Sequence, residues 1–283
     1  MIFSEQDILP NGVTIPRLAL GTWFLPNPQA AEAVKTALSI GYRHIDTAQA
    51  YHNEEGVGNA VRKSGLPRED FFLTTKVWIS NGGYEKAKAS IDESLAKLQT
   101  DYIDLLLIHQ PFNDYYGTWR AMEEAYKAGK LRAIGVSNFY PDRLIDLCQF
   151  SEIKPMVNQV ETHALFQQAA AHEVMAKYGV VHESWGPFAE GRKDFFTNPT
   201  LQAIGAKYSK SVAQTALRFL IQSDVVVIPK STHKERMAEN LDVFDFQLSQ
   251  EDMVAIRALD DGQSAFFSHY DPATVEFLTS LGR

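Results

Sequence analysis

Acid–base side chains stand at the ends of three successive apolar segments of the chain. Asp46, Lys76 and His109 each end or directly follow such a segment, and Tyr51 comes five residues after Asp46. A short apolar segment of this kind is typical of a buried β-strand. Because parallel strands bring their carboxyl ends to one side of a sheet or barrel, the four side chains could form one site.

The chemistry of this group indicates proton transfer. Burial alone would favour a neutral Lys76, whereas a carboxylate partner such as Asp46 would favour the ammonium. An ammonium beside Tyr51 would lower a phenol pKa that starts near ~10 and would make Tyr51 a general acid near neutral pH. His109 could donate a hydrogen bond to a carbonyl oxygen. Each residue taken singly could be structural, so the hypothesis rests on the group.

A basic cluster follows the last apolar segment. Lys230, Lys234 and Arg236 lie there, in a chain whose formal net charge is −8. Thr232 and Glu235 fit a capping box, which predicts that a helix begins at this point. Because a helix N-terminus offers free N–H groups and the positive end of its dipole, the cluster indicates a phosphate site. A solvated helix start is the structural alternative.

Amide, hydroxyl and aromatic side chains end the other segments. Ser137, Asn138 and Gln159 offer donors and acceptors that suit a carboxamide, and Trp185 offers a flat face for stacking. Core packing with satisfied polar groups is the alternative for each of them.

Eight apolar segments alternate with amphipathic stretches. The segments lack a polar/apolar alternation, as expected of parallel strands that are covered on both faces. The stretches have helical periodicity, and the first of them ends at Gly41, where a C-terminal cap is expected. The predicted strands are residues 18–20, 44–46, 72–76, 103–109, 131–136, 156–160, 180–185 and 225–228.

This order predicts a (β/α)8 TIM barrel that forms a single domain over residues 1–283. An N-terminal β-hairpin is expected over residues 8–15, because Asn11-Gly12 suits a type I′ turn. A C-terminal extra helix is expected after Ser249, which begins a possible capping box with Asp252. Barrels of this kind often bind phosphate in the loops after strands seven and eight, where the basic cluster lies.

A doubly wound sheet is the alternative architecture, and it would need a glycine-rich turn after its first strand. The nearest match begins at Gly56 and Gly58, lacks a third glycine and lies in a helical pattern. These glycines are better explained as relief of close packing.

Composition limits the class of protein. The chain has 283 residues, 45% of them hydrophobic and 22% charged, which is typical of a globular protein. Its net charge argues against nucleic acid or an anionic membrane as partner. Cys148 is the only cysteine, so the chain cannot form an intrachain disulfide, and this favours a reducing compartment. No apolar run approaches the ~18 residues of a membrane helix and no signal pattern begins the chain, so we expect a cytoplasmic protein, with a monomer as the default.

Read together, these segments resemble the aldo-keto reductase family nearly end to end. The chain is most similar to shorter bacterial members of the 2,5-diketo-gluconate reductase and methylglyoxal reductase type. The resemblance is carried by the segments 41–48 with Tyr51, 75–78, 106–111, 134–139, 158–161, 228–231 and 239–240.

The resemblance implies an enzyme that uses NADPH and no metal to reduce a small carbonyl substrate by direct hydride transfer. Tyr51 would be the proton donor, Lys76 paired with Asp46 would tune it, and His109 would orient the substrate carbonyl. The other implied cofactor-binding residues are Gly21, Thr22, Trp23, Asp46, Ser137, Asn138, Gln159, Trp185, Gly186, Pro187, Phe188, Gly191, Lys230, Ser231, Thr232, Arg236, Glu239 and Asn240. The implied substrate pocket consists of Trp23, Tyr51, Trp78, His109 and Phe112.

Two residues depart from the family pattern, and the tail bears on the size of the substrate. Gln110 stands where many relatives carry an aromatic residue, which would make that wall of the pocket more polar. His233 stands where Thr or Ser is common in the phosphate loop. The tail after Asp260 is short, so a large loop that encloses the substrate is not expected. The resemblance therefore favours small aldehydes, α-dicarbonyls and keto-sugars.

Other functions fit fewer residues. A barrel glycosidase would need two carboxylates across its site, and Glu161 and Glu183 are the candidates. A metal-dependent hydrolase could use His44 and Asp46, although no further ligand spacing supports it. A cofactor-sensing regulatory subunit would bind the nucleotide without turnover.

Overall fold

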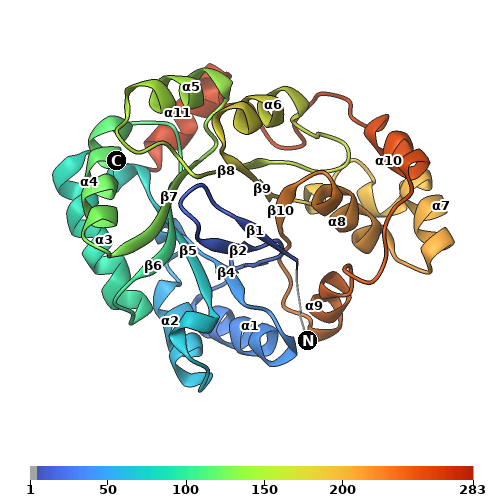
Figure 1. Cartoon of the computed structure of the whole chain (residues 1–283), viewed down its shortest axis with the longest axis horizontal. Helices are drawn as coiled ribbons and strands as arrows, with labels where there is room; N and C mark the ends of the chain where they lie inside the picture. The colour runs from blue at the N-terminus through green and yellow to red at the C-terminus, as the bar shows by residue number, and fades with distance from the viewer. Residues whose placement is uncertain (1–4, 283) are drawn as a thin grey trace.

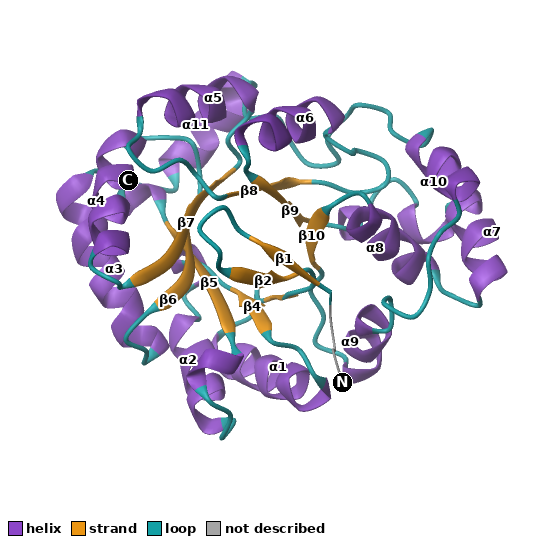
Figure 2. Cartoon of the chain, in the orientation of Figure 1, coloured by secondary structure: helices purple, strands orange, loops and turns teal. Residues whose placement is uncertain are grey.

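The computed structural model describes residues 5–282. One sheet of eight parallel strands, in the order β3 to β10, forms the wall of a barrel inside a ring of helices (Figures 1 and 2). Backbone hydrogen bonds from Ala19 to Val227 (2.9 Å) and from Gly21 to Pro229 (3.0 Å) close it between the first and last strands. The (β/α)8 barrel predicted from the sequence is confirmed.

The strands follow the predicted segments, with small shifts at their ends. The first strand begins two residues later than expected, because Leu18 makes only an isolated bridge to Val227. The strands are β3 Leu20–Gly21, β4 His44–Asp46, β5 Phe72–Val77, β6 Ile103–Ile108, β7 Leu131–Ser137, β8 Val157–Glu161, β9 Val181–Trp185 and β10 Val225–Ile228. All residues of β5 and β6 are buried, as strands covered on both faces require.

The helices cover the outside of the sheet. Gly41 ends the first of them in the left-handed conformation (φ 114°), as its position in the sequence predicts. The helices are α1 Asn27–Ile40, α2 Glu54–Lys63, α3 Tyr84–Leu98, α4 Tyr115–Lys127, α5 Pro141–Phe150, α6 Ala169–Tyr178, α7 Pro199–Tyr208, α8 Val212–Gln222, α9 Lys234–Leu241, α10 Gln250–Arg257 and α11 Pro272–Ser280.

Both glycines in α2 lie where this helix crosses its neighbours. A Cβ on Gly56 would come within 2.3 Å of the Asn27 carbonyl oxygen, and one on Gly58 within 2.6 Å of the Leu98 backbone. Both contacts are with backbone atoms that cannot give way cheaply. The glycines therefore permit close helix packing, as the sequence analysis suggests, and do not form a nucleotide-binding turn.

The N-terminal hairpin is present, but its predicted turn is wrong. It consists of β1 Gln6–Ile8 and β2 Thr14–Pro16, and it lies across the centre of the ring in Figure 1. Gly12 has a positive φ of 86°, whereas Asn11 does not, so the two residues cannot form a type I′ turn. Instead the Gly12 N–H donates to the Leu9 carbonyl (2.8 Å), in a turn whose second residue is Pro10.

The two predicted helix starts have different outcomes in the structure. α9 begins at Lys234, and neither Thr232 nor Glu235 forms the expected capping box, because His233 is the N-cap residue and makes no side-chain cap hydrogen bond. Ser249 does cap α10 by accepting from the Asp252 N–H (3.1 Å), although its own N–H donates to the Tyr208 hydroxyl.

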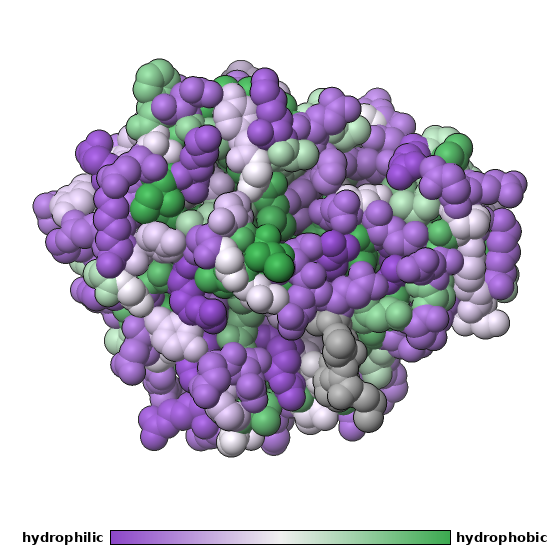
Figure 3. Space-filling model, in the orientation of Figure 1, coloured by the Kyte–Doolittle hydropathy of each residue, from purple (hydrophilic) through white to green (hydrophobic). Residues whose placement is uncertain are grey.

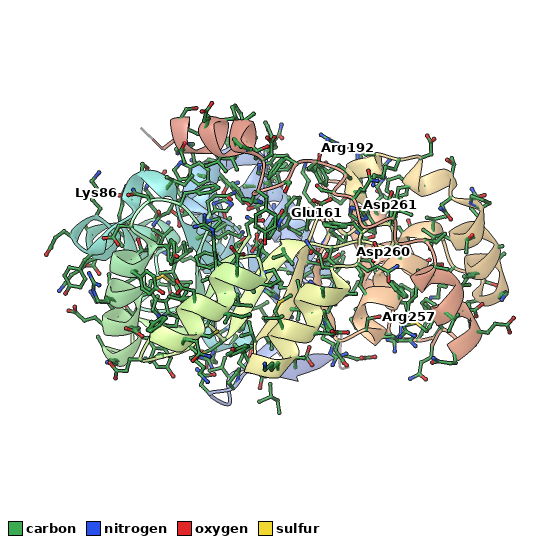
Figure 4. The ribbon with its side chains drawn as sticks, turned by 90° about the horizontal axis from the view of Figure 1, so that it is seen from above. Lys86, Glu161, Arg192, Arg257, Asp260 and Asp261 are labelled. Carbon is green, nitrogen blue, oxygen red and sulfur yellow. The ribbon has the colours of Figure 1, made fainter. Side chains whose placement is uncertain are left out.

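The two ends of the barrel are closed by different parts of the chain. Seen from the side, α11 lies at one end and the hairpin at the other (Figure 4). The surface at the hairpin end is mostly hydrophilic, with apolar residues in small separate groups (Figure 3). Among residues 5–282, no helix is both long and apolar enough to cross a membrane.

Candidate active site

A buried ion pair lies at the carboxyl ends of the second and third barrel strands. Lys76, at the end of β5, has no exposed surface, and its Nζ donates to Asp46 Oδ1 (2.5 Å) and to the Thr47 carbonyl (2.9 Å). Burial opposes the charge of the ammonium, but the carboxylate of Asp46 and the phenol of Tyr51 raise the pKa of Lys76. Lys76 is therefore a fixed positive charge in this part of the barrel.

Tyr51 and His109 lie beside this pair. Tyr51 ends a short 3₁₀ turn, Gln49–Tyr51, that follows β4, and Lys76 Nζ is 5.1 Å from the centre of its ring. His109 directly follows β6, with its ring 5.6 Å from that of Tyr51 and 5.1 Å from that of Trp78. The four residues that the sequence singled out thus come together at one end of the barrel.

Lys76 lowers the pKa of Tyr51, as predicted, but the predicted net lowering of that pKa is wrong. Burial raises the pKa of Tyr51, and the ammonium of Lys76 lowers it by less. The phenol therefore keeps its proton through neutral pH. Lys76 makes the phenolate less costly than burial alone would allow, but it does not bring the phenol near its titration point.

His109 is a neutral imidazole. Burial and the nearby ammonium of Lys76 lower its pKa well below the ordinary value. Its Nδ1 is buried and has no hydrogen-bond partner in the described part of the chain. A neutral imidazole can donate one N–H to a carbonyl oxygen without adding a second positive charge to the site.

Polar groups from the neighbouring strand ends are tied to one another. The Ser137 hydroxyl donates to the Gln159 carbonyl (2.8 Å). Asn138 takes a left-handed conformation (φ 61°), and its amide donates to the His109 carbonyl (3.0 Å) and accepts from the Trp185 indole N–H (2.9 Å). The predicted carboxamide-binding residues therefore form one connected group with the predicted stacking residue.

Gln159 connects this group to the ion pair. Its Nε2 donates to Asp46 Oδ2 and to Glu183 Oε2, both at 2.9 Å. Glu183 is fully buried inside the barrel. Glu183 lies beside Gln159 because the two residues are paired in the register of β9 and β8. The sequence does not reveal this register, so it could not predict the contact.

The carboxylates of the hydrolase alternative are otherwise engaged. Glu161 accepts hydrogen bonds from the Ser264 hydroxyl, the Ala265 N–H and His163, and Glu183 has no exposure. No group of three metal-binding side chains was found among residues 5–282. Glu161 is thus committed to other contacts and Glu183 is closed to solvent, so their arrangement does not favour the glycosidase alternative.

A cavity of about 640 Å³ lies at the rim, next to the ends of β9 and β10. Lys230 and Arg236 are exposed there, and neither forms an ion pair with any described residue. The six residues predicted to hold an adenosine phosphate and adenine all line it. The lining is Phe188, Phe196, Ser211, Val212, Ala213, Lys230, Ser231, Thr232, His233, Arg236, Glu239 and Asn240.

The loop after β9 borders this cavity. Gly186 (φ 64°) and Gly191 (φ 78°) both have positive φ, Pro187 is buried between them, and Phe188 reaches the cavity. At the first strand, a Cβ on Gly21 would lie 3.2 Å from the Ile228 side chain. The cavity, with the exposed cations Lys230 and Arg236 in its lining, could hold the anionic end of a ligand.

Comparison with known proteins agrees with this geometry. The family model described as "Aldo/keto reductase family" matches residues 17–261. The chain belongs to the aldo-keto reductase family. It is 49% identical over 253 residues to a glyoxal reductase of Bacillus subtilis, covering 89% of this chain and 91% of that one. It is 41% identical over 258 residues to the methylglyoxal reductase DkgA of Escherichia coli, covering 90% and 93% of the two chains.

A solved structure gives the same fold. The aldo-keto reductase AKR2E4 of Bombyx mori, in complex with NADP, superposes with a TM-score of 0.90 at 35% identity, and the match covers 98% of each chain. Membership of this family confirms the oxidoreductase class that the sequence resemblance implies.

In this aldo-keto reductase the C-terminal segment crosses the site. We call residues 261–271 the C-terminal strap. The carboxylate of Glu161 accepts hydrogen bonds from the Ser264 hydroxyl and the Ala265 N–H (Figure 4 labels Glu161 and Asp261). The ring of the next residue, Phe266, lies 5.2 Å from that of Trp185. The short tail after Asp260 therefore reaches the predicted stacking residue, Trp185.

The strap and α11 also contact the predicted substrate pocket. His269 Nε2 lies 2.7 Å from Gln110 Oε1, and its ring stacks 5.9 Å from that of Phe112. The Trp78 indole lies 3.4 Å from the Leu281 carbonyl, whereas Trp23 remains 44% exposed. Gln110 thus binds the strap, and its amide is not simply a polar wall. No periodicity in the strap sequence indicates these contacts.

Proposed function

We propose that this protein reduces small aldehydes, α-dicarbonyls and keto-sugars to alcohols with NADPH, and that Tyr51 is the proton donor. The observation that carries the proposal is the buried Lys76–Asp46 pair beside Tyr51 and His109, at the end of the barrel where the polar strand ends meet. The names of the glyoxal and methylglyoxal reductases that are similar to this chain support this substrate class.

The residues at the rim fit NADPH. Lys230 and Arg236 would bind the 2′-phosphate, and the hydroxyls of Ser231 and Thr232 would add hydrogen bonds. Ser137, Asn138 and Gln159 would hold the carboxamide, and Trp185 would stack on the nicotinamide. The NADP complex of the silkworm relative supports this choice of cofactor. When bound, NADPH supplies the hydride.

Each residue of the ion-pair group has its own task in this mechanism. His109, as a neutral donor, holds the substrate carbonyl oxygen and polarises it. Tyr51 gives its phenolic proton to that oxygen as negative charge develops there. Lys76 stabilises the phenolate that Tyr51 becomes, and Asp46 keeps Lys76 in place.

The test is oxidation of NADPH by the purified protein with a panel of carbonyls: glyoxal, methylglyoxal, simple aldehydes and keto-sugars, each repeated with NADH. We expect turnover with the small carbonyls and a preference for NADPH. Tight NADPH binding with no turnover on any carbonyl would favour a cofactor-sensing subunit instead. We further propose that the protein acts as a monomer in the cytoplasm, as a single domain.

A further inference from the structure

Glu183 is a buried acid that the proposed mechanism does not use. It lies in β9, and its Cα is paired in register with that of Gln159 in β8. Its Oε2 accepts from Gln159 Nε2 (2.9 Å), while its Oε1 has no hydrogen-bond partner among the described residues. Burying a carboxyl group costs folding free energy, because the group loses its hydration. The presence of Glu183 inside the barrel therefore needs a physical explanation.

The two N–H groups of the Gln159 amide are both engaged. One donates to Asp46 Oδ2 and the other to Glu183 Oε2. Turning the amide over would set its oxygen against Asp46, an acceptor with no proton to offer, because Asp46 is the partner of Lys76. The carbonyl oxygen Oε1 of Gln159 is therefore the atom of this side chain left to bind a ligand.

The charges around Glu183 indicate that it acts as a neutral acid. The titratable groups that face it are Asp46 and His44 from β4 and Lys76 from β5. Lys76 and Asp46 neutralise each other, and burial lowers the pKa of His44 to about 3, so no free positive charge remains for a second carboxylate. Burial, reinforced by Asp46, raises the pKa of Glu183 to about 8.

We propose that Glu183 is a positioning residue for carbonyl reduction: it holds the amide of Gln159 between two acceptors and thereby sets the direction from which Gln159 meets the nicotinamide carboxamide. This inference rests on the proposed function, because it assigns Gln159 to that carboxamide. Glu183 touches neither substrate nor cofactor in this scheme. It acts on how well the cofactor is bound and aligned.

Two variants of similar size separate the hydrogen bond from the packing. Glu183→Gln keeps a carbonyl oxygen that can accept from Gln159, and Glu183→Met fills the space with a much weaker acceptor. We expect NADPH affinity, measured by fluorescence titration without substrate, to change less than about three-fold in Glu183→Gln. In Glu183→Met it should weaken about five- to ten-fold, the usual effect of one lost hydrogen bond.

If Glu183 had only a structural role, its replacement would also change the KM for the carbonyl, and it would weaken NADPH binding whether or not Gln159 is present. Under the proposal, the carbonyl KM at saturating NADPH stays unchanged in Glu183→Met. In a Gln159→Ala background, Glu183→Met should cause no further loss of NADPH affinity, because the amide that it positions is gone. Should methionine not fit, Glu183→Leu provides the comparison with another apolar side chain of similar size.

The outcomes distinguish this inference from the proposed function. If the wild type binds NADPH and reduces carbonyls while Glu183→Met and Glu183→Gln bind NADPH alike, only the positioning role is wrong. An affinity loss in Glu183→Met that persists in the Gln159→Ala background would also overturn it. If the wild type does not bind NADPH, the proposed function fails and the role of Glu183 fails with it.

Discussion

The acid chemistry of this site depends on how one phenol responds to two opposing effects. Burial removes water from Tyr51 and penalises its anion, and Lys76 compensates part of that penalty from 5.1 Å away. The net pKa stays above its ordinary value, so Tyr51 enters each cycle protonated. Its acidity is needed only when negative charge appears on the substrate oxygen, and the fixed ammonium then lowers the cost of losing the proton.

Replacing this phenol tests the assignment directly. Tyr51→Phe keeps the ring and removes the proton, so we expect kcat to fall about 100-fold or more. NADPH affinity should stay within a few-fold, because the phenol is not needed to hold the cofactor. Steady-state kinetics and a fluorescence titration measure the two quantities. Undiminished turnover in Tyr51→Phe would remove Tyr51 from the mechanism.

Glu183 predicts a dependence of stability on pH. Its pKa is raised on folding to about 8, so between the carboxyl's ordinary pKa and that value the folded state binds more protons than the unfolded state. Stability then decreases as the pH rises, by at most about 1.4 kcal/mol per pH unit from this one group. Glu183→Gln removes the effect, so its advantage over the wild type should grow from pH 5 to pH 8 in urea unfolding. A constant difference would show that Glu183 is already ionised in the fold.

Arg236 is expected to select the cofactor. It is exposed at the cavity and forms no ion pair with the residues described, so a phosphate could use its whole guanidinium. Arg236→Ala should weaken NADPH binding about ten-fold or more, as expected for a lost charge-assisted hydrogen bond, and should change NADH binding little. Titrations with both nucleotides measure the ratio, and an equal loss for the two would argue against a 2′-phosphate contact.

At the residue scale the sequence predicts which side chains meet, but not how they influence one another. Asp46, Lys76 and His109 could be placed together because each ends a strand of a predicted barrel. The net direction of the Tyr51 pKa shift could not be predicted, since it depends on the degree of burial. The contact between Gln159 and Glu183 depends on strand register, which composition does not reveal.

At the scale of elements, hydrophobic periodicity was sufficient for the strands and most helices, whereas local hydrogen bonding decided their ends. The hairpin turn begins at Leu9, with Pro10 as its second residue, and not at the predicted Asn11-Gly12. The N-cap residue of α9 is His233 and not the predicted Thr232. Both errors arise where several residues of similar propensity compete for one position. Gly41, where a left-handed conformation is required, could be placed correctly.

The packing of α2 on α3 depends on Gly58. A Cβ there would approach the Leu98 backbone to 2.6 Å, so Gly58→Ala must push the helices apart although alanine has the higher helix propensity. We expect a loss of about 1–3 kcal/mol of unfolding free energy, measured by urea unfolding. Lys63→Ala, at an exposed position of the same helix, should change it by less than about 0.5 kcal/mol. A neutral Gly58→Ala would contradict the close contact.

For the whole molecule, eight βα units in order were enough to predict the barrel, because few architectures can cover eight parallel strands on both faces. The C-terminal strap could not be predicted. Its position depends on long-range contacts, such as Glu161 with Ala265 and Gln110 with His269, between residues that are far apart in the sequence. A segment that folds back over a finished barrel leaves no periodic pattern of its own.

Removing residues 262–283 tests what this closure contributes. In α11, Leu278 packs on Ile79 and Phe112 in a small cluster that is separate from the main core, so the barrel should remain folded, and its far-UV circular dichroism spectrum should lose only the small contribution of α11. The substrate pocket would lose His269 and the contact of Trp78 with Leu281. We therefore expect the KM for methylglyoxal to rise about ten-fold, equivalent to about 1.4 kcal/mol of binding. A truncated chain that folds and keeps the full-length KM would show that the strap covers the site without binding the substrate.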